Sequence, residues 1–501
     1  MKQPNTHFRY WLFLALLLTA IFHSLAWSRF PTDVDTINFT LALDNFDPSI
    51  DSPHPPGYPL FVYSARLASN IFGKVHAYQA VNLAMLLGTG VLLYRIFERI
   101  GKPEIGFAAG VLVLTHPLAW AATTIPESYI SDAFFACLIA NLGLIPELSK
   151  YRSWTAGFLV FLMLALVRPV SGVLLLPLAF AATFYTRRSW GFSVVYCGVA
   201  GLAILVAYAI TAELAGGFET YRQAAARVMG GSFKSASILG GAPLDAHIKM
   251  VMRLAAWWFF LVLPAIILVA YTAFKAKRTV VSRNLLEPLL VGLAWMLPAL
   301  GFYAAIYYLK PTYQLIYLPC LLIPVACCLL GQESVFSRRQ AWGILAVLAA
   351  IQLAVFILPT AKFPQAVFRQ SQGYIRQQDR AWKELQEKLA AFPHKDTLLI
   401  WGNHPSLSLY ATRLLHGFPV AASFDERNGR LNYVEPKTMA WLPAGESPDS
   451  IPSKYQAVIW VGQQDGQALI RYFDLSGGQD RRVDRIAKLG GDSYGDSAST
   501  K

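Results

Sequence analysis

The sequence predicts a mostly α-helical, polytopic membrane protein with a small α/β domain at its C-terminal end. Of its 501 residues 55% are hydrophobic and only 15% are charged, which is little charge for a soluble protein of this length. Apolar runs of about 16–24 residues, long enough to cross a bilayer core, recur from residue 10 to about residue 359. Beyond them the chain turns polar. We therefore expect a membrane domain over residues 1–360 and an α/β domain over residues 361–501.

About eleven of these runs are expected to cross the membrane as helices. The first follows a basic N-terminal segment and resembles a signal peptide, but no convincing cleavage site comes after it, so we expect a retained helix. The fifth and sixth runs are separated by Arg168 and Pro169, and they form either a hairpin of two helices or one broken helix. The runs cover residues 10–27, 77–97, 104–121, 129–147, 153–167, 170–186, 191–213, 250–274, 286–308, 313–330 and 341–359.

Basic residues gather in alternate loops between the runs, as the positive-inside rule requires of cytoplasmic loops. With the N-terminus in the cytoplasm, each cluster falls on the inner side of a bacterial-type plasma (inner) membrane. The formal charge of +13 therefore indicates membrane topology and not a nucleic-acid partner. Residues 28–76, residues 214–249 and the C-terminal domain are then extracytoplasmic. The clusters are Arg95, Arg99 and Lys102; Lys150 and Arg152; Arg187 and Arg188; Lys275, Lys277, Arg278 and Arg283; and Arg338 and Arg339.

The C-terminal domain shows the alternation of helix and buried strand that is typical of α/β folds. Residues 361–391 look helical. The apolar runs 396–402 and 455–462 each end in a glycine, as buried strands often do. Residues 405–416 are a candidate crossover helix between them. The last dozen residues, rich in Gly, Ser and Asp, are expected to be disordered.

Two carboxylates, Asp33 and Asp35, follow the first predicted span closely. At a membrane surface a carboxylate serves as a general base, as a metal ligand or as a solvated loop charge. Residues 36–43 predict a short helix lying on the membrane, which would hold Asp35 at its N-terminal end. A helix N-terminus favours the ionised carboxylate that a base requires.

The next feature is the stretch Pro-His-Pro-Pro-Gly-Tyr-Pro at residues 53–59. Its four prolines fix φ and remove amide donors, and Gly57 permits a sharp turn. One interpretation is a rigid connector with no other role. In the other interpretation His54, together with Tyr58, contacts a phosphate or a sugar of the substrate.

The pattern Asp-x-x-x-Phe-x-x-Ala from Asp35, followed by His-Pro-Pro-Gly-Tyr-Pro-Leu-Phe from His54, resembles the first outer loop of GT-C fold glycosyltransferases. The likeness is to the protein O-mannosyltransferase-like (family 39) enzymes and their bacterial polyprenyl-phosphate-sugar-dependent kin. It covers residues 1 to about 330 and is strongest at the proline-rich block. The resemblance implies inverting sugar transfer on the outer face, with an acidic residue of the first outer loop as base. That role maps to Asp35, with Asp33 as the second candidate.

The resemblance also implies an acidic residue in the second outer loop, facing the first. Glu127 matches it, and the alternative is an ordinary solvated glutamate. Asp132 follows one turn into the fourth span, where a carboxylate is costly unless it faces a polar cavity.

The segment from Lys310 to Tyr313 resembles the lysine/arginine-x-x-Tyr segment that contacts the lipid phosphate in such enzymes, so both residues are candidate substrate contacts. A departing phosphate needs a cation to stabilise its developing charge; the alternative for Lys310 is a snorkelling side chain. Arg168, at the outer tip between the fifth and sixth spans, has a similar claim. Further candidate contacts are Arg66, Arg222 and Arg227.

Together these residues predict transfer from a polyprenyl-phosphate sugar to an acceptor hydroxyl on a lipid, glycan or protein. Glu127 would orient the acceptor or hold a divalent metal, and whether Mg²⁺ or Mn²⁺ is needed stays open. The amphipathic stretch 218–228 is a candidate lid, and the C-terminal domain a candidate acceptor selector. Two rival functions are a lipid-linked substrate transporter or flippase and a non-catalytic scaffold. No nucleotide-binding P-loop or GxGxxG motif is present in the sequence.

Overall fold

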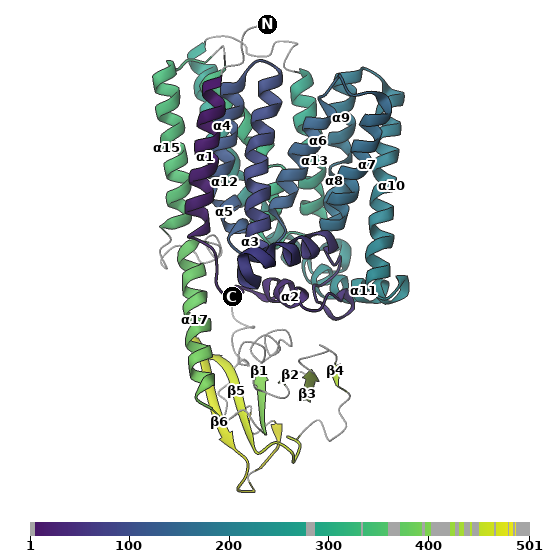
Figure 1. Cartoon of the computed structure of the whole chain (residues 1–501), viewed down its shortest axis with the longest axis vertical. Coiled ribbons are helices and arrows are strands. Elements are labelled where there is room, and N and C mark those ends of the chain that lie inside the picture. Colours follow the sequence, from purple (N-terminus) through teal and green to yellow (C-terminus); the bar gives the residue numbers. More distant parts are fainter. Residues whose placement is uncertain are drawn as a thin grey trace. The chain divides into compact units, whose positions relative to one another are not determined.

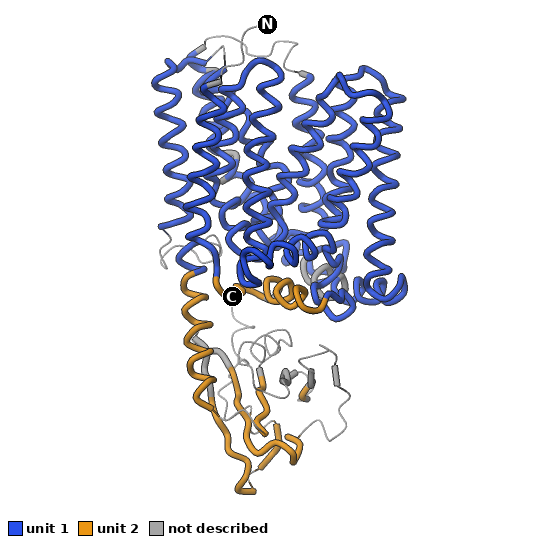
Figure 2. Tube along the Cα trace, in the orientation of Figure 1, with its two compact units in different colours: residues 1–28, 46–375 blue, residues 29–45, 376–501 orange. Residues whose placement is uncertain are grey.

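A computed structural model of the chain describes most of the helical region and part of the C-terminal region. The described residues are 6–276, 286–331, 334–358, 371–392, 396–401, 421–425, 430–434, 441–442, 450–464, 467–478, 480–483 and 486. They divide into two compact units (Figure 2): unit 1 comprises Met1–Ser28 and Phe46–Ile375, and unit 2 comprises Arg29–Asn45 and Arg376–Lys501. The predicted boundary between residues 360 and 361 lies outside the described residues and stays a prediction.

Unit 1 is a bundle of helices that run roughly side by side (Figure 1). Its helices are α1 (Thr6–Ser24), η1 (Pro48–Ile50), α3 (Pro59–Arg99), α4 (Pro103–Leu114), α5 (Pro117–Thr123), α6 (Ile130–Gly143), α7 (Lys150–Val167), α8 (Pro169–Leu174), α9 (Leu176–Arg187), α10 (Trp190–Leu214), α11 (Phe218–Ala236), η2 (Ile238–Gly240), α12 (Leu244–Ala276), α13 (Leu286–Ala305), η4 (Pro311–Ile316), α14 (Leu318–Leu330) and α15 (Arg338–Ile357).

The predicted membrane bundle is confirmed, and the protein is an integral membrane protein. Among the described residues six helices are long and apolar enough to cross a membrane, or eight if two bent pairs each count as one span. The expected span at 104–121 is such a pair: α4 and α5 meet at 57°. The bend follows from Pro117, which has no amide to continue the helix and starts α5 instead. The expected runs 129–147 and 313–330 contain the shorter apolar helices α6 and α14.

The segment around Arg168 is a pair of helices and not one broken span. Helix α7 ends at Val167, Arg168 has non-helical backbone angles, and Pro169 begins α8. Lys150–Val167 and Pro169–Arg187 each qualify as a separate span candidate. The residue before a proline is disfavoured in the α region, so the break falls at Arg168.

Helix α3 is longer than the span expected at 77–97, because it begins in the predicted outer loop. It starts at Pro59 and is interrupted at Gly73, where φ is +73° and ψ is 161°. Such a backbone is easily adopted only by glycine. Residues before Gly73 therefore form a helical segment with its own direction, and much of the expected loop 28–76 is helical.

Two ion pairs join segments that the positive-inside rule places on the same side of the membrane. The Arg9 guanidinium in α1 is 2.9 Å from the carboxylate of Glu98 at the end of α3. The Arg188 guanidinium after α9 is 2.8 Å from the carboxylate of Glu287 at the start of α13. These pairs join loops that the positive-inside rule assigned to the same side. Which side faces the cytoplasm stays a prediction.

Unit 2 is an α/β unit, as the sequence predicted. It holds α2 (Val34–Ala42), most of α17 (Gln372–Ala390), and β1 (Thr397–Trp401), β2 (Ala421–Asp425), β3 (Arg430–Val434), β4 (Trp441–Leu442), β5 (Ala457–Gln464) and β6 (Gln467–Asp474). The described strands form a sheet in the order β4-β3-β2-β1-β5-β6. Strand β1 pairs in parallel with β2 and β5, and the outer pairs are antiparallel.

The two strands expected from the sequence are β1 and β5, at the centre of this sheet. Their side chains Leu398, Ile400, Val458 and Trp460 are buried in one hydrophobic core. Central parallel strands are covered on both faces, which is why they are apolar throughout. The expected crossover helix at 405–416 and the last dozen residues, expected to be disordered, lie outside the described residues.

Candidate functional site

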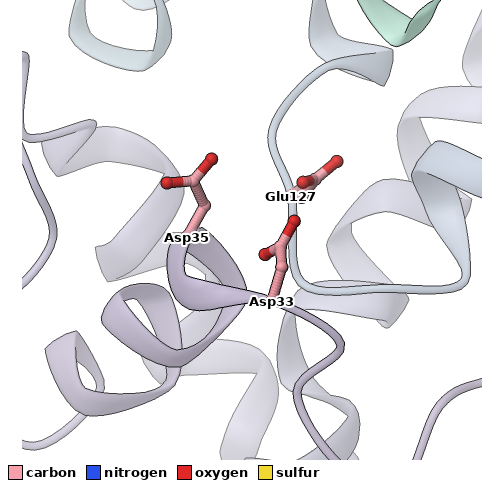
Figure 3. Close-up of side chains that lie close together, drawn as sticks. All are labelled: Asp33, Asp35 and Glu127. Atoms are coloured by element: carbon pink, nitrogen blue, oxygen red, sulfur yellow. The ribbon is translucent and has the colours of Figure 1, made fainter. Parts of the chain in front are cut away.

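The two acidic residues of the first loop differ in their local roles at the start of α2 (Figure 3). Asp33 is the N-cap: its Oδ1 accepts the amide of Thr36 at 3.0 Å, while Thr36 Oγ1 accepts the amide of Asp33 at 2.9 Å. This reciprocal capping box satisfies amides that a helix start leaves without partners. Asp35 lies in the first turn. The predicted helix start at residue 36 is therefore two residues late, and Asp35 lies inside the helix.

Glu127 lies in the turn between α5 and α6, and its residue surface is only 1% exposed. Its carboxylate forms an ion pair with the ammonium of Lys310, which comes just before η4. The side-chain amide of Asn82 in α3 donates to the carbonyl oxygen of Glu127 at 2.7 Å and so holds the turn. Glu127 is thus not a solvated loop residue, and Lys310, 20% exposed, does not simply snorkel.

A second ion pair lies beside the first. Asp132, in the first turn of α6, is fully buried, and its Oδ1 is 3.0 Å from Nε of Arg168. The Arg168 side chain is 14% exposed, and it also donates to Ser128 Oγ at 3.4 Å. A buried carboxylate is stable only when a partner offsets its lost hydration. Arg168 is that partner, which explains how Asp132 is tolerated one turn into an apolar helix.

Tyr129 joins the two ion pairs. The Arg168 guanidinium carbon is 4.4 Å from the centre of the Tyr129 ring, and the Lys310 nitrogen is 5.8 Å from it. A cation held near an aromatic face is stabilised by the negative potential of that face. We call Glu127, Tyr129, Asp132, Arg168 and Lys310 the paired-ion cluster. The sequence analysis did not single out Tyr129, because its cationic partners come from α7 and η4, far along the chain.

Tyr313 extends the paired-ion cluster with further aromatic rings. Its ring centre is 5.2 Å from that of Tyr129 and 5.3 Å from that of Tyr303, with which it is stacked. Tyr307 and Tyr308 lie 6.3 and 6.1 Å away. The predicted substrate residues Lys310 and Tyr313 therefore lie in one aromatic and charged region of unit 1.

The proline-rich block is a tight turn packed within unit 1. Gly57 has φ of +91°, and a Cβ there would come within 2.8 Å of Cγ of Pro48. Only glycine fits both the backbone and the space. Nε2 of His54 and the hydroxyl of Tyr58 are hydrogen-bonded at 3.1 Å. This pairing supports the connector interpretation of His54, and contact with a substrate stays a prediction for both residues.

Helix α11 is the amphipathic helix expected over 218–228, and it extends to Ala236. Its Tyr221 hydroxyl donates to the carbonyl of Pro56 at 3.5 Å, and its Arg227 donates to the carbonyl of Ser49. The Glu219 carboxylate accepts hydrogen bonds from Arg222, which lowers the pKa of Glu219 to about 2. Helix α11 therefore lies against the proline-rich block.

The secondary cationic candidates engage partners of their own and are not part of the paired-ion cluster. Arg66 lies over the ring of Tyr63, Arg222 pairs with Glu219 within α11, and Arg227 bonds to the backbone of Ser49.

Asp33, Asp35 and Glu127 each offer carboxylate oxygens that a metal ion can bind (Figure 3). Asp33 and Asp35 belong to unit 2, and Glu127 belongs to unit 1. Their donor atoms are all carboxylate oxygens, the hard ligands that suit Mg²⁺ or Mn²⁺ better than thiolate-preferring metals. The chemistry of this donor set fits the divalent metal that the sequence left open.

No protein-family model matches this sequence, and no curated protein matches it. Among solved structures the chain is similar to ArnT from Cupriavidus metallidurans bound to undecaprenyl phosphate, with a TM-score of 0.50 and 14% identity over 76% of this chain and 71% of that one. The chain has the GT-C fold. ArnT in the apo state gives a TM-score of 0.48 at 16% identity, with the same coverage of both chains.

The oligosaccharyltransferase of Archaeoglobus fulgidus, solved with zinc and sulfate, gives a TM-score of 0.41 at 12% identity, over 81% of this chain and 62% of that one. The similarity to ArnT bound to undecaprenyl phosphate confirms the fold expected from the proline-rich block.

Proposed function

We propose that the protein is an inverting membrane glycosyltransferase. It transfers a sugar from a polyprenyl-phosphate donor to an acceptor hydroxyl on the outer face of the membrane. The observation that carries the proposal is the paired-ion cluster, in which Lys310 and Arg168 flank Tyr129. Charged side chains buried in a helical membrane bundle are costly, and they are typically kept for function.

The position of the paired-ion cluster in the bundle supports this assignment. Helix α13 begins at Leu286, beside the contact between Glu287 and Arg188, and it runs to Ala305, shortly before Lys310. Lys310 therefore follows the end of α13 opposite to the basic loops. If those loops are cytoplasmic, the paired-ion cluster is extracytoplasmic, where the phosphate of an exported lipid-linked sugar would be.

In the proposed reaction the acceptor oxygen bonds to the anomeric carbon while the bond from that carbon to the phosphate oxygen breaks. The electron pair leaves with the polyprenyl phosphate, whose growing negative charge Lys310 and Arg168 would stabilise. Attack from the face opposite the phosphate inverts the configuration. Lys310 already pairs with Glu127, and Arg168 pairs with Asp132. A phosphate oxygen that binds Lys310 would therefore either share its ammonium group with Glu127 or displace the Glu127 carboxylate.

Asp35 is proposed as the base that takes the proton of the acceptor hydroxyl. Its place in the first turn of α2 favours the ionised form. Asp33 is the weaker candidate because its Oδ1 is engaged in the capping box. Tyr313, beside Tyr129, is a proposed contact to the donor, as are His54 and Tyr58.

Glu127 would orient the acceptor or serve as a carboxylate ligand to a divalent metal, Mg²⁺ or Mn²⁺. Bound there, the metal would supply positive charge toward the donor phosphate. A polyprenyl phosphate is the proposed donor carrier partly because ArnT, which shares the fold, was solved with undecaprenyl phosphate. The acceptor is proposed to be a lipid, glycan or protein hydroxyl.

The test compares Asp35→Asn with Asp33→Asn in purified protein supplied with a radiolabelled polyprenyl-phosphate sugar and membrane acceptors. Asp35→Asn should lower transfer about 10²–10⁴-fold and keep donor binding. Asp33→Asn should keep most of the activity, since asparagine caps a helix as well as aspartate does. The reverse pattern would assign the base to Asp33. If neither variant loses activity, the base is neither aspartate. If the wild type transfers no sugar and membrane glycoconjugates show no sugar increment that depends on the protein, the glycosyltransferase proposal is wrong.

A further inference from the structure

Helix α17 contacts the segment that carries Asp35 through one buried carboxylate. Asp379 lies in α17 and is 7% exposed. Its Oδ1 accepts the backbone amide of Arg29 at 2.9 Å and that of Phe30 at 3.0 Å. These residues all belong to unit 2, although 350 positions separate Arg29 from Asp379 in the sequence. The candidate base thus belongs to the same compact unit as the C-terminal α/β region.

The backbone between this contact and Asp35 is held by bonds at nearly every residue. The amides of Thr32 and Asp33 both donate to Oγ1 of Thr36, each at 2.9 Å. Between Phe30 and Thr32 only Pro31 remains, which is buried and whose ring fixes φ. A displacement at Arg29 and Phe30 would therefore pass along a stiff segment to the first turn of α2.

The environment of Asp379 shows that this contact is specific. Burial raises the pKa of its carboxyl group, while the amides of Arg29 and Phe30 favour the ionised form. The guanidinium of Arg376, one turn earlier in α17, is 3.6 Å from Oδ2. A carboxylate loses hydration at such a site, and hydrogen bonds to it are stronger than bonds between neutral groups.

We infer that Asp379 is a positioning residue for the proposed transfer reaction: through the amides of Arg29 and Phe30 it fixes the start of α2, and with it Asp35, to α17. The C-terminal unit then contributes to catalysis by placing the base. This inference rests on the proposed function of Asp35. Asp379 itself touches no reacting atom.

The experiment compares Asp379→Leu and Asp379→Asn in the full-length protein. Leucine removes the acceptor at similar size, whereas asparagine keeps a carbonyl oxygen for the two amides. Glu387→Leu is the matched control, because Glu387 lies on the exposed face of the same helix, 66% exposed. Steady-state transfer from the polyprenyl-phosphate sugar gives kcat and KM. Amide hydrogen exchange over residues 29–36 reads the contact without using activity.

Asp379→Leu should lower kcat on the order of 10²-fold with KM for the donor nearly unchanged, because a misplaced base impairs chemistry more than binding. The amides of Arg29 and Phe30 should exchange about tenfold faster, as expected for loss of hydrogen bonds to a charged acceptor. Asp379→Asn should recover most of the activity, and Glu387→Leu should behave like the wild type. If Asp379→Leu does not fold, Asp379→Asn serves as the test by itself. In that variant a smaller increase in the exchange rates of the Arg29 and Phe30 amides should accompany a partial fall in kcat.

Two results would overturn the inference. One is unchanged exchange at Arg29 and Phe30 in both Asp379 variants, which would show that the carboxylate does not hold the segment. The other is faster exchange with wild-type kcat, which would show that the segment need not be held. Failure of the proposed function is recognised separately, since the wild type would then transfer no sugar, or Asp35→Asn would keep full activity, while the exchange data still report on Asp379.

Discussion

The ion pair of Lys310 and Glu127 can be tested by a double-mutant cycle that separates its structural role from its proposed catalytic role. Lys310→Met keeps much of the length and volume of the side chain but removes its charge. The Glu127 carboxylate, 1% exposed, would then lose its counter-ion in a buried position. Removing one partner of a fully buried pair destabilises a protein by 3–5 kcal/mol as a general range. Because Lys310 is 20% exposed, we expect about 3 kcal/mol.

The double variant Lys310→Met with Glu127→Gln removes both charges, so its stability should be close to that of the wild type. Stability is measured as the thermal unfolding midpoint in one detergent, with Lys249→Met as control, since Lys249 forms an exposed pair with Asp245. If the Lys310→Met variant and the double variant have the same thermal unfolding midpoint, well below that of the wild type, the two side chains do not stabilise one another.

Activity should respond differently from stability in the same cycle. If Lys310 contacts the leaving phosphate, its loss should lower kcat by about 10²–10³-fold, the usual cost of one preorganised donor to a developing oxyanion. Restoring stability through Glu127→Gln should not restore this activity. A stable double variant with near wild-type transfer would refute the phosphate role of Lys310 and leave the ion pair a purely structural feature.

Two further predictions concern the turn and helix that position the site. Gly57→Ala should destabilise the protein by at least about 1–2 kcal/mol, because alanine is strained at a φ of +91° and its Cβ would clash with Pro48, and the thermal midpoint measures this. For Asp379 the prediction concerns how stability depends on pH. Burial raises the pKa of its carboxyl group in the folded state, so ionisation of this group at neutral pH opposes folding. Folding becomes more favourable as the pH falls through the folded-state pKa toward the lower pKa of the unfolded state. The stability of the wild type relative to Asp379→Asn should therefore rise between about pH 7 and pH 4, and a flat difference in unfolding midpoint would show that the carboxyl does not titrate differently in the folded state.

The break between the helices around Arg168 and the start of α2 show where prediction from sequence reached its limit. The sequence left a hairpin and a broken helix open, because the length of the two runs allows both. Pro169 does not choose between them by itself; the packing of both α7 and α9 against α6 and α10 does. For α2, the apolar pattern predicts a start at Thr36, whereas the Thr36 hydroxyl completes a capping box with Asp33. The spacing Asp-x-x-Thr is a signal that could have placed the start correctly.

Tyr129 and Asp379 were missed for a different reason. The contacts that give them their roles come from distant parts of the chain: Tyr129 meets cations from two other segments, and Asp379 accepts amides from the far end of the chain. A tyrosine beside a predicted loop and an aspartate on a polar helix are common. Without the fold, nothing distinguishes these two from the others.

By itself the sequence determined that the chain is a helical membrane bundle followed by an α/β region, and that Asp35 lies at a helix start. These properties depend on the length and polarity of single segments, which are local. Only the tertiary structure decided that Lys310 pairs with Glu127, 183 residues away, and that Asp379 holds the segment before Asp35. Such pairings depend on which helix ends come together when the bundle packs, and burial then makes each charge require a partner.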